Sequence, residues 1–398
     1  MTKQLQEAYI VAAVRTPVGK APRGAFKSTR PDTLLAHVLQ SVLVRAPQIE
    51  AVRVDDVIVG CAMPEYEQGM NVARIGVLLA GLPNSVAGMT INRFCSSGLN
   101  AVSIAADRIR TGEADIVIAA GTESMSMIPM LGRLALNHDV FARNENLGIA
   151  YGMGLTAEKV AERWKVSRDD QDAFALASHQ KALAAQGSGE FDAEIAAVPV
   201  RENVPDLATA KVATRTKVVE RDEGPRPETT LEGLGKLRPV FAARGSVTAG
   251  NSSQMSDGAG AAILVSERVL KELGLVPLAR FAGFAVGGVA PEIMGVGPIA
   301  AIPKVLRQTG VRKEDLDWIE LNEAFAAQSL AVIRDLDLDP GKVNPLGGAI
   351  ALGHPLGATG AVRTATIVHG LRRRKQKYGM VTMCIGTGMG AAGIFEAV

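Results

Sequence analysis

Two thiols, an imidazole and an amide lie in short segments that are rich in glycine or small residues, and all four groups can take part in catalysis. Glycine lets the backbone turn sharply and leaves N–H groups free for a ligand. A nucleophilic thiol, a base that works near neutral pH and free N–H donors are what carbon–carbon bond chemistry on a thioester requires. The segments are Cys95-Ser96-Ser97-Gly98, Asn322-Glu323-Ala324-Phe325, Gly353-His354-Pro355-Leu356-Gly357-Ala358-Thr359-Gly360 and Cys384-Ile385-Gly386-Thr387-Gly388-Met389-Gly390.

Cys95 precedes a helical pattern that runs over residues 99–110. A thiol at a helix N-terminus meets the positive end of the helix dipole, so we expect a lowered pKa and a reactive thiolate. The alternative is a buried structural cysteine, and the local sequence leaves both open. Cys61 ends a strand-like segment outside any glycine frame and is expected to be structural.

His354 lies between Gly353 and Pro355, which can hold its imidazole rigidly, as a general base requires. Cys384 ends a predicted strand and leads into a glycine-rich turn, whose free N–H groups could form an oxyanion hole. A phosphate-binding loop is the rival interpretation, but neither G-K-[ST] nor G-x-G-x-x-G is completed there.

Asn322 follows a predicted strand and precedes a predicted helix. It is therefore either a helix N-cap or a hydrogen-bonding residue of the site. Glu323 beside it could complement the helix dipole in the first turn.

Alternating short strands and helices are predicted to position these groups, and the alternation indicates parallel βαβ units. The stretches that begin at Gly98 and Gly360 are similar enough to indicate an internal duplication. Strands are expected over 9–14, 57–59, 116–120, 279–286, 318–321 and 380–384, and helices over 33–44, 73–80, 99–110, 299–308, 324–336 and 360–372.

The middle of the chain reads differently from both halves. It contains two predicted helices within 157–186, with an N-cap at Ser167, and a charged, loop-rich stretch over 205–239. We expect an insertion that covers a site, after which a strand over 261–265 returns to the first half. The predicted domains are 1–122 for the N-terminal half, 123–249 for the insertion, 250–274 for the rest of the N-terminal half, and 275–398 for the C-terminal half.

Size and charge exclude some classes of function. The 398 residues are 47% hydrophobic, which is ample for a large core, and the net charge of +2 gives no sign of a nucleic-acid partner. The three cysteines have neither disulfide nor zinc-ligand spacing. The start, Met1-Thr2-Lys3-Gln4, lacks signal-peptide features and no stretch is long and apolar enough to span a membrane, so a cytoplasmic location is expected.

Taken together and in order, the four segments resemble those of the thiolase family over essentially the whole chain. Val14-Arg15-Thr16-Pro17 and Val247-Thr248-Ala249-Gly250-Asn251-Ser252-Ser253 add to the resemblance. It implies an α/β fold with five layers, α-β-α-β-α, built from two duplicated halves with an inserted loop domain. It also implies a homodimer or homotetramer that cleaves 3-ketoacyl-CoA with CoA to acyl-CoA and acetyl-CoA. CoA is then a substrate, and neither a metal nor a redox cofactor is required.

The resemblance assigns a role to each group. Cys95 would be the nucleophile that accepts the acyl chain, and His354 would deprotonate it or activate the incoming CoA thiol. Cys384 would be the acid or base at the α-carbon of acetyl-CoA. Asn322 would hold a water that forms one oxyanion hole with His354, and the N–H groups of Cys95 and Gly386 would form a second one.

The resemblance also places substrate contacts at Arg226, Ser253 and Met153, with the guanidinium near the CoA nucleotide and the hydroxyl near the pantetheine. Gly152 stands where short-chain biosynthetic thiolases carry a histidine. This is similar to the degradative 3-ketoacyl-CoA thiolases, whose pockets take longer chains, and it implies a role in fatty-acid β-oxidation with a multienzyme partner as one option.

Three alternatives stay open. The first is a biosynthetic acetoacetyl-CoA thiolase (acetyl-CoA C-acetyltransferase). The second is a decarboxylating ketoacyl synthase, against which the second cysteine, Cys384, speaks. The third is a non-catalytic acyl-CoA-binding relative, which should lack one of the four site residues.

Overall fold

The computed structural model describes residues 5–130 and 135–398, so the predicted features of residues 1–4 lie outside the described part of the chain. Its strands are β1 Ala8–Arg15, β2 Gly19–Lys20, β3 Asp56–Gly60, β4 Ala87–Ile91, β5 Ile116–Ser124, β6 Val198–Asp206, β7 Lys211–Val219, β8 Ser256–Ser266, β9 Ala279–Gly288, β10 Leu316–Leu321, β11 Tyr378–Ile385 and β12 Met389–Glu396. Its helices are α1 Pro31–Val44, α2 Val72–Leu79, α3 Ser97–Arg110, α4 Met153–Arg163, α5 Arg168–Gly187, α6 Leu231–Gly235, α7 Glu267–Glu272, α8 Gly297–Thr309, α9 Ala326–Asp335, α10 Ala349–Leu352 and α11 Thr359–Arg374.

One large mixed sheet connects both halves of the protein. Its order is β10-β11-β12-β9-β1-β8-β5-β3-β4, with β2 paired to β8. The expected parallel pairs exist between β3, β4 and β5 and between β10 and β11. The antiparallel pairing of β1, β8, β9 and β12 with their neighbours was not predicted. The glycine turn that joins β11 to β12 is too short for a crossover helix, so it makes a hairpin.

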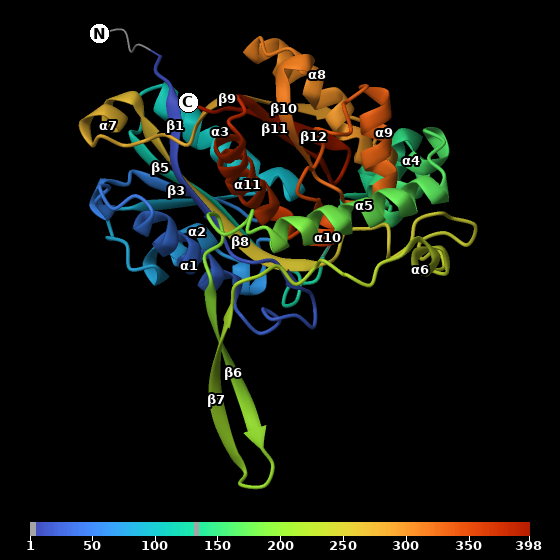
Figure 1. Ribbon diagram of the computed structural model, residues 1–398, viewed down its shortest axis with the longest axis horizontal. Helices are drawn as coiled ribbons and strands as arrows, with labels where there is room; N and C mark the ends of the chain where they lie inside the picture. The colour runs from blue at the N-terminus through green and yellow to red at the C-terminus, as the bar shows by residue number, and fades with distance from the viewer. Residues whose placement is uncertain (1–4, 131–134) are drawn as a thin grey trace.

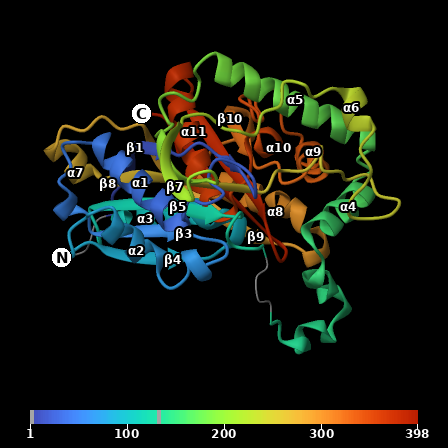
Figure 2. The ribbon, with the colours of Figure 1, turned by 90° about the horizontal axis from the view of Figure 1, so that it is seen from below.

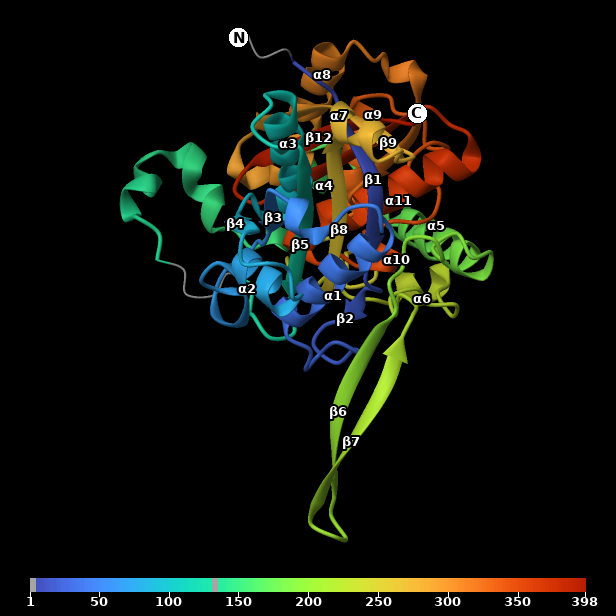
Figure 3. The ribbon, with the colours of Figure 1, turned by 90° about the vertical axis from the view of Figure 1, so that its left-hand side faces the viewer.

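Five layers result, because the sheet bends between β1 and β9 and encloses two helices (Figures 1 and 3). The helices α3 and α11 pack on each other and on strands of both halves. The outer face of the N-terminal half carries α1 and α2, and that of the C-terminal half carries α8 and α9. The expected α-β-α-β-α arrangement is therefore confirmed.

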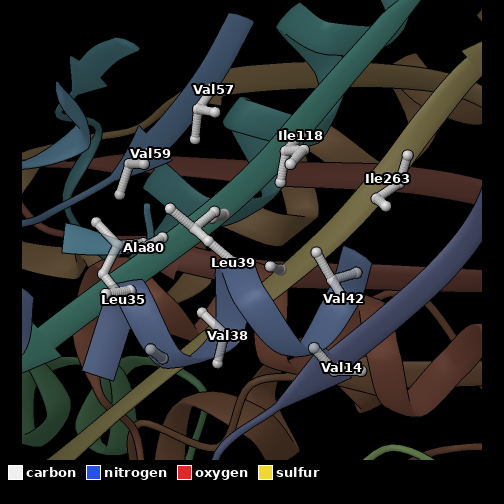
Figure 4. Packing of buried hydrophobic residues seen from close by; sticks show 14 of the residues in the cluster. Val14, Leu35, Val38, Leu39, Val42, Val57, Val59, Ala80, Ile118 and Ile263 are labelled. Atoms are coloured by element: carbon white, nitrogen blue, oxygen red, sulfur yellow. The ribbon is translucent and has the colours of Figure 1, made fainter. Parts of the chain in front are cut away.

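The outer core of the N-terminal half shows why its elements form. Helix α1 buries a stripe of apolar residues at helical spacing, including Leu35, Leu39 and Val42, while Gln40 between them is exposed. In Figure 4 this stripe faces Ile118 of β5 and Ile263 of β8. Burying such side chains contributes about 2 kcal/mol each.

The two middle helices begin where the site loops end, and two glycines set the distance between them. A Cβ atom at Gly98, in the first turn of α3, would lie 2.6 Å from the backbone nitrogen of Ala361. A Cβ atom at Gly360, in the first turn of α11, would overlap the backbone of Leu99. Only glycine at both positions permits this backbone contact.

The insertion leaves the first half after β5 and returns through β8. Its helices α4, α5 and α6 lie on the side of α9 and α10 (Figure 2), and Ser167 caps α5 as predicted. The stretch 205–239, predicted to be loop-rich, contains β7, which pairs with β6 in a hairpin that projects from the body (Figure 1). The predicted end of the strand 116–120 is too early, since β5 continues to Ser124 in register with β8.

A buried ion cluster ties the insertion to the first strand. The guanidinium of Arg15 lies 2.6 Å from a Glu194 carboxylate oxygen and 2.7 Å from one of Asp222. All three groups are buried, so removing Arg15 would leave two carboxylates in the interior without their cation. Among the described residues, no helix has both the length and the apolar composition needed to cross a membrane.

Candidate active site

A 3₁₀ turn over Phe94–Ser96, between β4 and α3, presents Cys95. Phe94 adopts a φ of 44°, a region that non-glycine residues rarely occupy. The hydroxyl of Ser97 holds the turn, because it accepts a hydrogen bond from the Arg93 N–H at 2.8 Å and donates one to the Phe94 carbonyl at 2.7 Å. The turn leaves Cys95 only 8% exposed.

The expected activation of Cys95 by a helix terminus is wrong in direction. Burial raises the pKa of the Cys95 thiol to about 11, and the nearby carboxyl of Glu123 adds to the increase. The N–H groups of Gly386 and of Cys95 itself act on the sulfur in the opposite direction and lower its pKa. Desolvation wins because the thiol lies in the turn before α3, away from water.

The turn after β11 brings the second thiol to the same place. Gly386 follows the end of β11, and Thr387 and Gly388 take φ angles of 70° and 94° to close the hairpin. Cys384 is fully buried, and burial raises the pKa of its thiol well above the usual value. The thiol of Cys95 raises it further, so the two sulfurs are close enough to influence each other.

His354 follows the one-turn helix α10 and is fixed through its backbone and its ring. The preceding Gly353 has a φ of 91°, and a Cβ atom there would lie 2.5 Å from the Ser256 hydroxyl. That hydroxyl accepts the His354 N–H at 3.0 Å. On the ring, Nδ1 lies 2.6 Å from the Thr359 hydroxyl and Nε2 lies 3.3 Å from Nδ2 of Asn322.

The protonation state of His354 suits a base. The Asn322 NH₂ group can only donate, so in its assigned orientation Nε2 accepts and the ring proton sits on Nδ1, beside Thr359. Burial lowers the pKa of His354 to about 3, and the buried cation of Arg363 contributes to the decrease. The imidazole is therefore neutral in the resting protein.

Asn322 is not a helix cap. Helix α9 begins at Ala326 with Phe325 as its N-cap, four and three residues beyond Asn322. The side chain of Asn322 instead contacts His354, and its Oδ1 is buried without a hydrogen-bond partner among the described residues. A buried carbonyl oxygen of this kind is suited to a water or a substrate group.

Glu323 was expected to complement the helix dipole in the first turn of the following helix. It does not, because α9 begins three residues later, at Ala326. Its buried carboxylate accepts hydrogen bonds from the Ser178 hydroxyl at 2.7 Å, the Asn344 amide at 2.8 Å and the Ile350 N–H at 3.2 Å. It thereby joins the insertion helix α5 to α10, the helix that leads into His354.

The sequence analysis missed Glu123, which organises the loops around Cys95. Its carboxylate accepts the N–H groups of Ala62 at 2.7 Å, Gly357 at 2.8 Å and Met63 at 3.2 Å, and it also accepts the amide of Gln68. Burial raises its pKa to about 7 despite these donors. A sequence signal was available, because Glu123 lies only three positions after the apolar strand-like run 116–120.

The loops that carry the four predicted groups come together at the ends of β10, β11 and the middle helices. Asn322 contacts His354, the Gly386 N–H acts on Cys95, and Cys95 packs in one apolar cluster with Leu356 of the His354 loop. Cys61 is buried 4.0 Å from Glu123, as a structural cysteine would be.

The three predicted substrate contacts lie at different depths. Met153 packs against the apolar cluster that contains Cys384. The N–H of Ser253 donates to the Ala324 carbonyl at 2.9 Å, directly after Asn322 and Glu323. Arg226 has an exposed side chain, and its N–H donates to Nδ1 of His179 at 3.2 Å.

Comparisons with known proteins identify the family of the whole chain. The family model "Thiolase, N-terminal domain" matches residues 8–268, and "Thiolase, C-terminal domain" matches residues 275–397. The 3-ketoacyl-CoA thiolase of Bacillus subtilis is 49% identical over 98% of this chain and 100% of its own. The acetyl-CoA acetyltransferase of Bacillus anthracis superposes with a TM-score of 0.90 at 40% identity, with both chains fully covered. The dimeric peroxisomal thiolase of Saccharomyces cerevisiae superposes with a TM-score of 0.89 at 42% identity, over 99% of this chain and 98% of that one.

Proposed function

The chain belongs to the thiolase family, and we propose that it is an acetyl-CoA C-acyltransferase of degradative metabolism. It cleaves 3-ketoacyl-CoA with CoA into acyl-CoA and acetyl-CoA, in a reaction of the β-oxidation type. The division into two thiolase halves interrupted by a loop domain over 123–249 belongs to the same proposal.

The observation that carries the proposal is the pair of buried thiols, Cys95 and Cys384, which lie close enough for Cys95 to raise the pKa of Cys384, beside the Gly386 N–H. In the proposed first step the neutral imidazole of His354 takes the proton of Cys95, whose sulfur attacks the 3-keto carbon. A decarboxylating enzyme on the same fold has no need of a second thiol. Here Cys384 gives its proton to the α-carbon of the departing acetyl-CoA enolate.

Two separate places are available for negative charge. The N–H groups of Cys95 and Gly386 converge on the Cys95 sulfur, where the tetrahedral intermediate forms. His354 becomes a donor at Nε2 once it holds the thiol proton, and with a water at Asn322 it would stabilise the enolate oxygen. Separate holes matter because the two oxyanions belong to different carbonyl groups.

We also propose that Met153 and Ser253 border the acyl and pantetheine path and that Arg226 meets the CoA nucleotide. The packing of Met153 near Cys384 and the Ser253–Ala324 hydrogen bond support the first two contacts. An exposed guanidinium suits a phosphate-bearing ligand, which supports the third.

A homodimer or homotetramer is proposed for the assembly. The similar yeast structure is described as dimeric, which supports this proposal. A cytoplasmic location and an association with other β-oxidation enzymes are retained as predictions.

A second candidate is a biosynthetic acetoacetyl-CoA thiolase, which the similarity to the Bacillus anthracis acetyltransferase favours. Gly152 argues against this candidate. A Cβ atom at this position would meet nothing within 4 Å, so a larger side chain would fit and packing does not require the glycine. The side chain that would narrow a short-chain site is absent there.

The deciding experiment measures CoA-dependent thiolysis of a series of 3-ketoacyl-CoAs that starts with acetoacetyl-CoA and extends through medium to long chains. The proposal predicts that kcat/KM increases beyond the four-carbon substrate. Activity confined to acetoacetyl-CoA would favour the biosynthetic candidate. No cleavage at any length would contradict both, and the Cys384→Ala variant serves as the inactive control.

A further inference from the structure

We propose that Gln328 is a positioning residue for proton transfer, because its side-chain amide donates a hydrogen bond to the Cys384 sulfur. This inference rests on the proposed function, in which Cys384 is the acid or base at the α-carbon. It adds a group to the site that neither the motifs nor the comparisons indicate.

Gln328 is held rigidly beside the thiol. It lies in the first turn of α9 and is fully buried. The terminal amide atom that faces Cys384 is 3.4 Å from Sγ. On its other side the chain is packed against Gly295, where a Cβ atom would come within 2.7 Å of the Gln328 Cβ. The amide therefore has little freedom to turn away from the sulfur.

The hydrogen-bond partners decide which amide atom faces the sulfur. With oxygen on that side, the oxygen accepts from the Cys384 thiol at 3.4 Å, but it also lies against the Asn322 backbone carbonyl oxygen, and the nitrogen lies against the Ser329 N–H. With nitrogen on that side, it donates to the Asn322 carbonyl at 3.2 Å, and the oxygen accepts from the Ser329 hydroxyl at 3.0 Å and the Ser329 N–H at 2.7 Å. The second orientation pairs the amide with both of these backbone groups, and it turns an N–H of Gln328 toward the Cys384 sulfur.

A donor at this position has a chemical consequence. In the cleavage direction the S–H bond of Cys384 breaks, a C–H bond forms at the α-carbon, and a thiolate remains. Burial makes a thiolate at Cys384 unfavourable, and a hydrogen bond from an N–H stabilises the charged form. The same amide donates to the backbone carbonyl of Asn322. One side chain therefore connects the acid–base thiol, Cys384, to the residue proposed to hold the water that binds the enolate.

The test measures two steps separately: proton transfer by Cys384 and acetylation of Cys95. Exchange of the acetyl-CoA methyl hydrogens for deuterium, followed by NMR, reports on Cys384. Acetylation of Cys95 by acetyl-CoA, followed by CoA release in a single turnover, does not require that proton transfer. Gln328→Met keeps the length of the side chain and removes both amide donors. We expect deuterium exchange to fall at least tenfold and its pH profile to move to higher pH, with acetylation changed less than about threefold.

Two further variants make the result interpretable. Gln328→Glu has the shape of glutamine, so it tests the same point if the methionine variant does not fold, and its carboxylate should suppress exchange at least as strongly. Gln40→Met on the outer helix α1 is the matched control and should change neither rate. Unchanged exchange in the Gln328 variants would overturn the inference, and so would an equal loss in both steps, which indicates a structural role. A wild-type protein that neither exchanges nor acetylates would instead overturn the proposed function.

Discussion

At the scale of single residues, the site rests in an uncharged state. Burial raises the pKa of Cys95 to about 11 and lowers that of His354 to about 3, so both are neutral at physiological pH. Cys95 and His354 therefore do not form a thiolate–imidazolium ion pair before the substrate binds. The proton must move when the substrate is in place, and the N–H groups of Gly386 and Cys95 then face a developing negative charge.

This charge state predicts how alkylation of Cys95 depends on pH. Thiolate is the reactive form, and below the pKa its fraction increases tenfold for each pH unit. With a pKa of about 11, the rate of modification by iodoacetamide should rise steadily from pH 7 to pH 10. Peptide mapping by mass spectrometry would assign the modified cysteine. A rate that levels off near pH 8 would show that the thiol is activated in the resting protein.

Residue chemistry was predictable from sequence only where a local frame marked it. The glycines around His354 and Cys384 indicate free backbone donors and fixed loops, and in the structure His354 contacts Asn322 while the Gly386 N–H acts on Cys95. The direction of the Cys95 pKa was not predictable, because burial by distant segments decides it. Glu123 and Gln328 act through contacts with residues far away in the chain, which no local pattern reports.

At the scale of elements, the site depends on the contact between the first turns of α3 and α11. Each of these turns follows one site loop, so their separation determines how closely the loops of Cys95 and His354 meet. Gly98 and Gly360 allow that contact because neither carries a Cβ atom.

Gly360→Ala should therefore separate the two loops. The new methyl group overlaps the backbone of Leu99, which cannot move without shifting α3. We expect a loss of roughly 3 kcal/mol in the free energy of unfolding, measured by urea denaturation, with a larger proportional loss of thiolysis. Gly187→Ala, at the exposed end of α5 with open space around it, is the control and should be neutral or slightly stabilising. Full activity in Gly360→Ala would contradict the role given to this contact.

The elements with strong periodicity were predictable to within a few residues, such as α1, α3, β3 and β9. The missed strands lack the usual signals. Strand β12 is rich in glycine and alanine and owes its form to pairing with β11 and β9 on its two sides. Strand β4 is short and partly exposed, and the β6–β7 hairpin is polar and contains prolines.

At the scale of the whole molecule, the body and the projecting β6–β7 hairpin are energetically distinct. Only the base of the hairpin joins a core, through Val198, Val200 and Val219. Further out, its side chains are exposed or at most half-buried, and a two-stranded ribbon contributes little stability by itself (Figure 3).

Shortening the hairpin should therefore leave the body intact. Replacing residues 202–215 by Asn-Gly between the paired residues Arg201 and Thr216 gives a two-residue turn that suits the strand twist. We expect Tm to change by less than about 3 °C and thiolysis to be retained. Calorimetry, together with the molar mass in solution, would check this. A large loss of Tm or a smaller assembly would show that the hairpin contacts another copy of the chain.

The topology was predictable only in part at this scale. A repeated α/β unit indicated two halves, and the layers of α3 and α11 follow from that duplication. The mixed sheet was missed because the long insertion between β5 and β8, and the tight hairpin between β11 and β12, both return the chain antiparallel. The direction of a strand depends on the length and path of the connection before it, and predicting the order of strands and helices along the chain does not reveal that path.

The central claim is that the acyl group passes through Cys95 with Cys384 as the proton donor. The most direct test is mass spectrometry of the protein quenched with acid after mixing with a medium-chain 3-ketoacyl-CoA in the absence of CoA. The account predicts one added acyl group, two carbons shorter than the substrate chain, on the peptide that contains Cys95. It also predicts that this adduct disappears when CoA is added and does not form in Cys95→Ser. An unmodified Cys95 peptide, or an acyl group on Cys384 or Cys61, would contradict it.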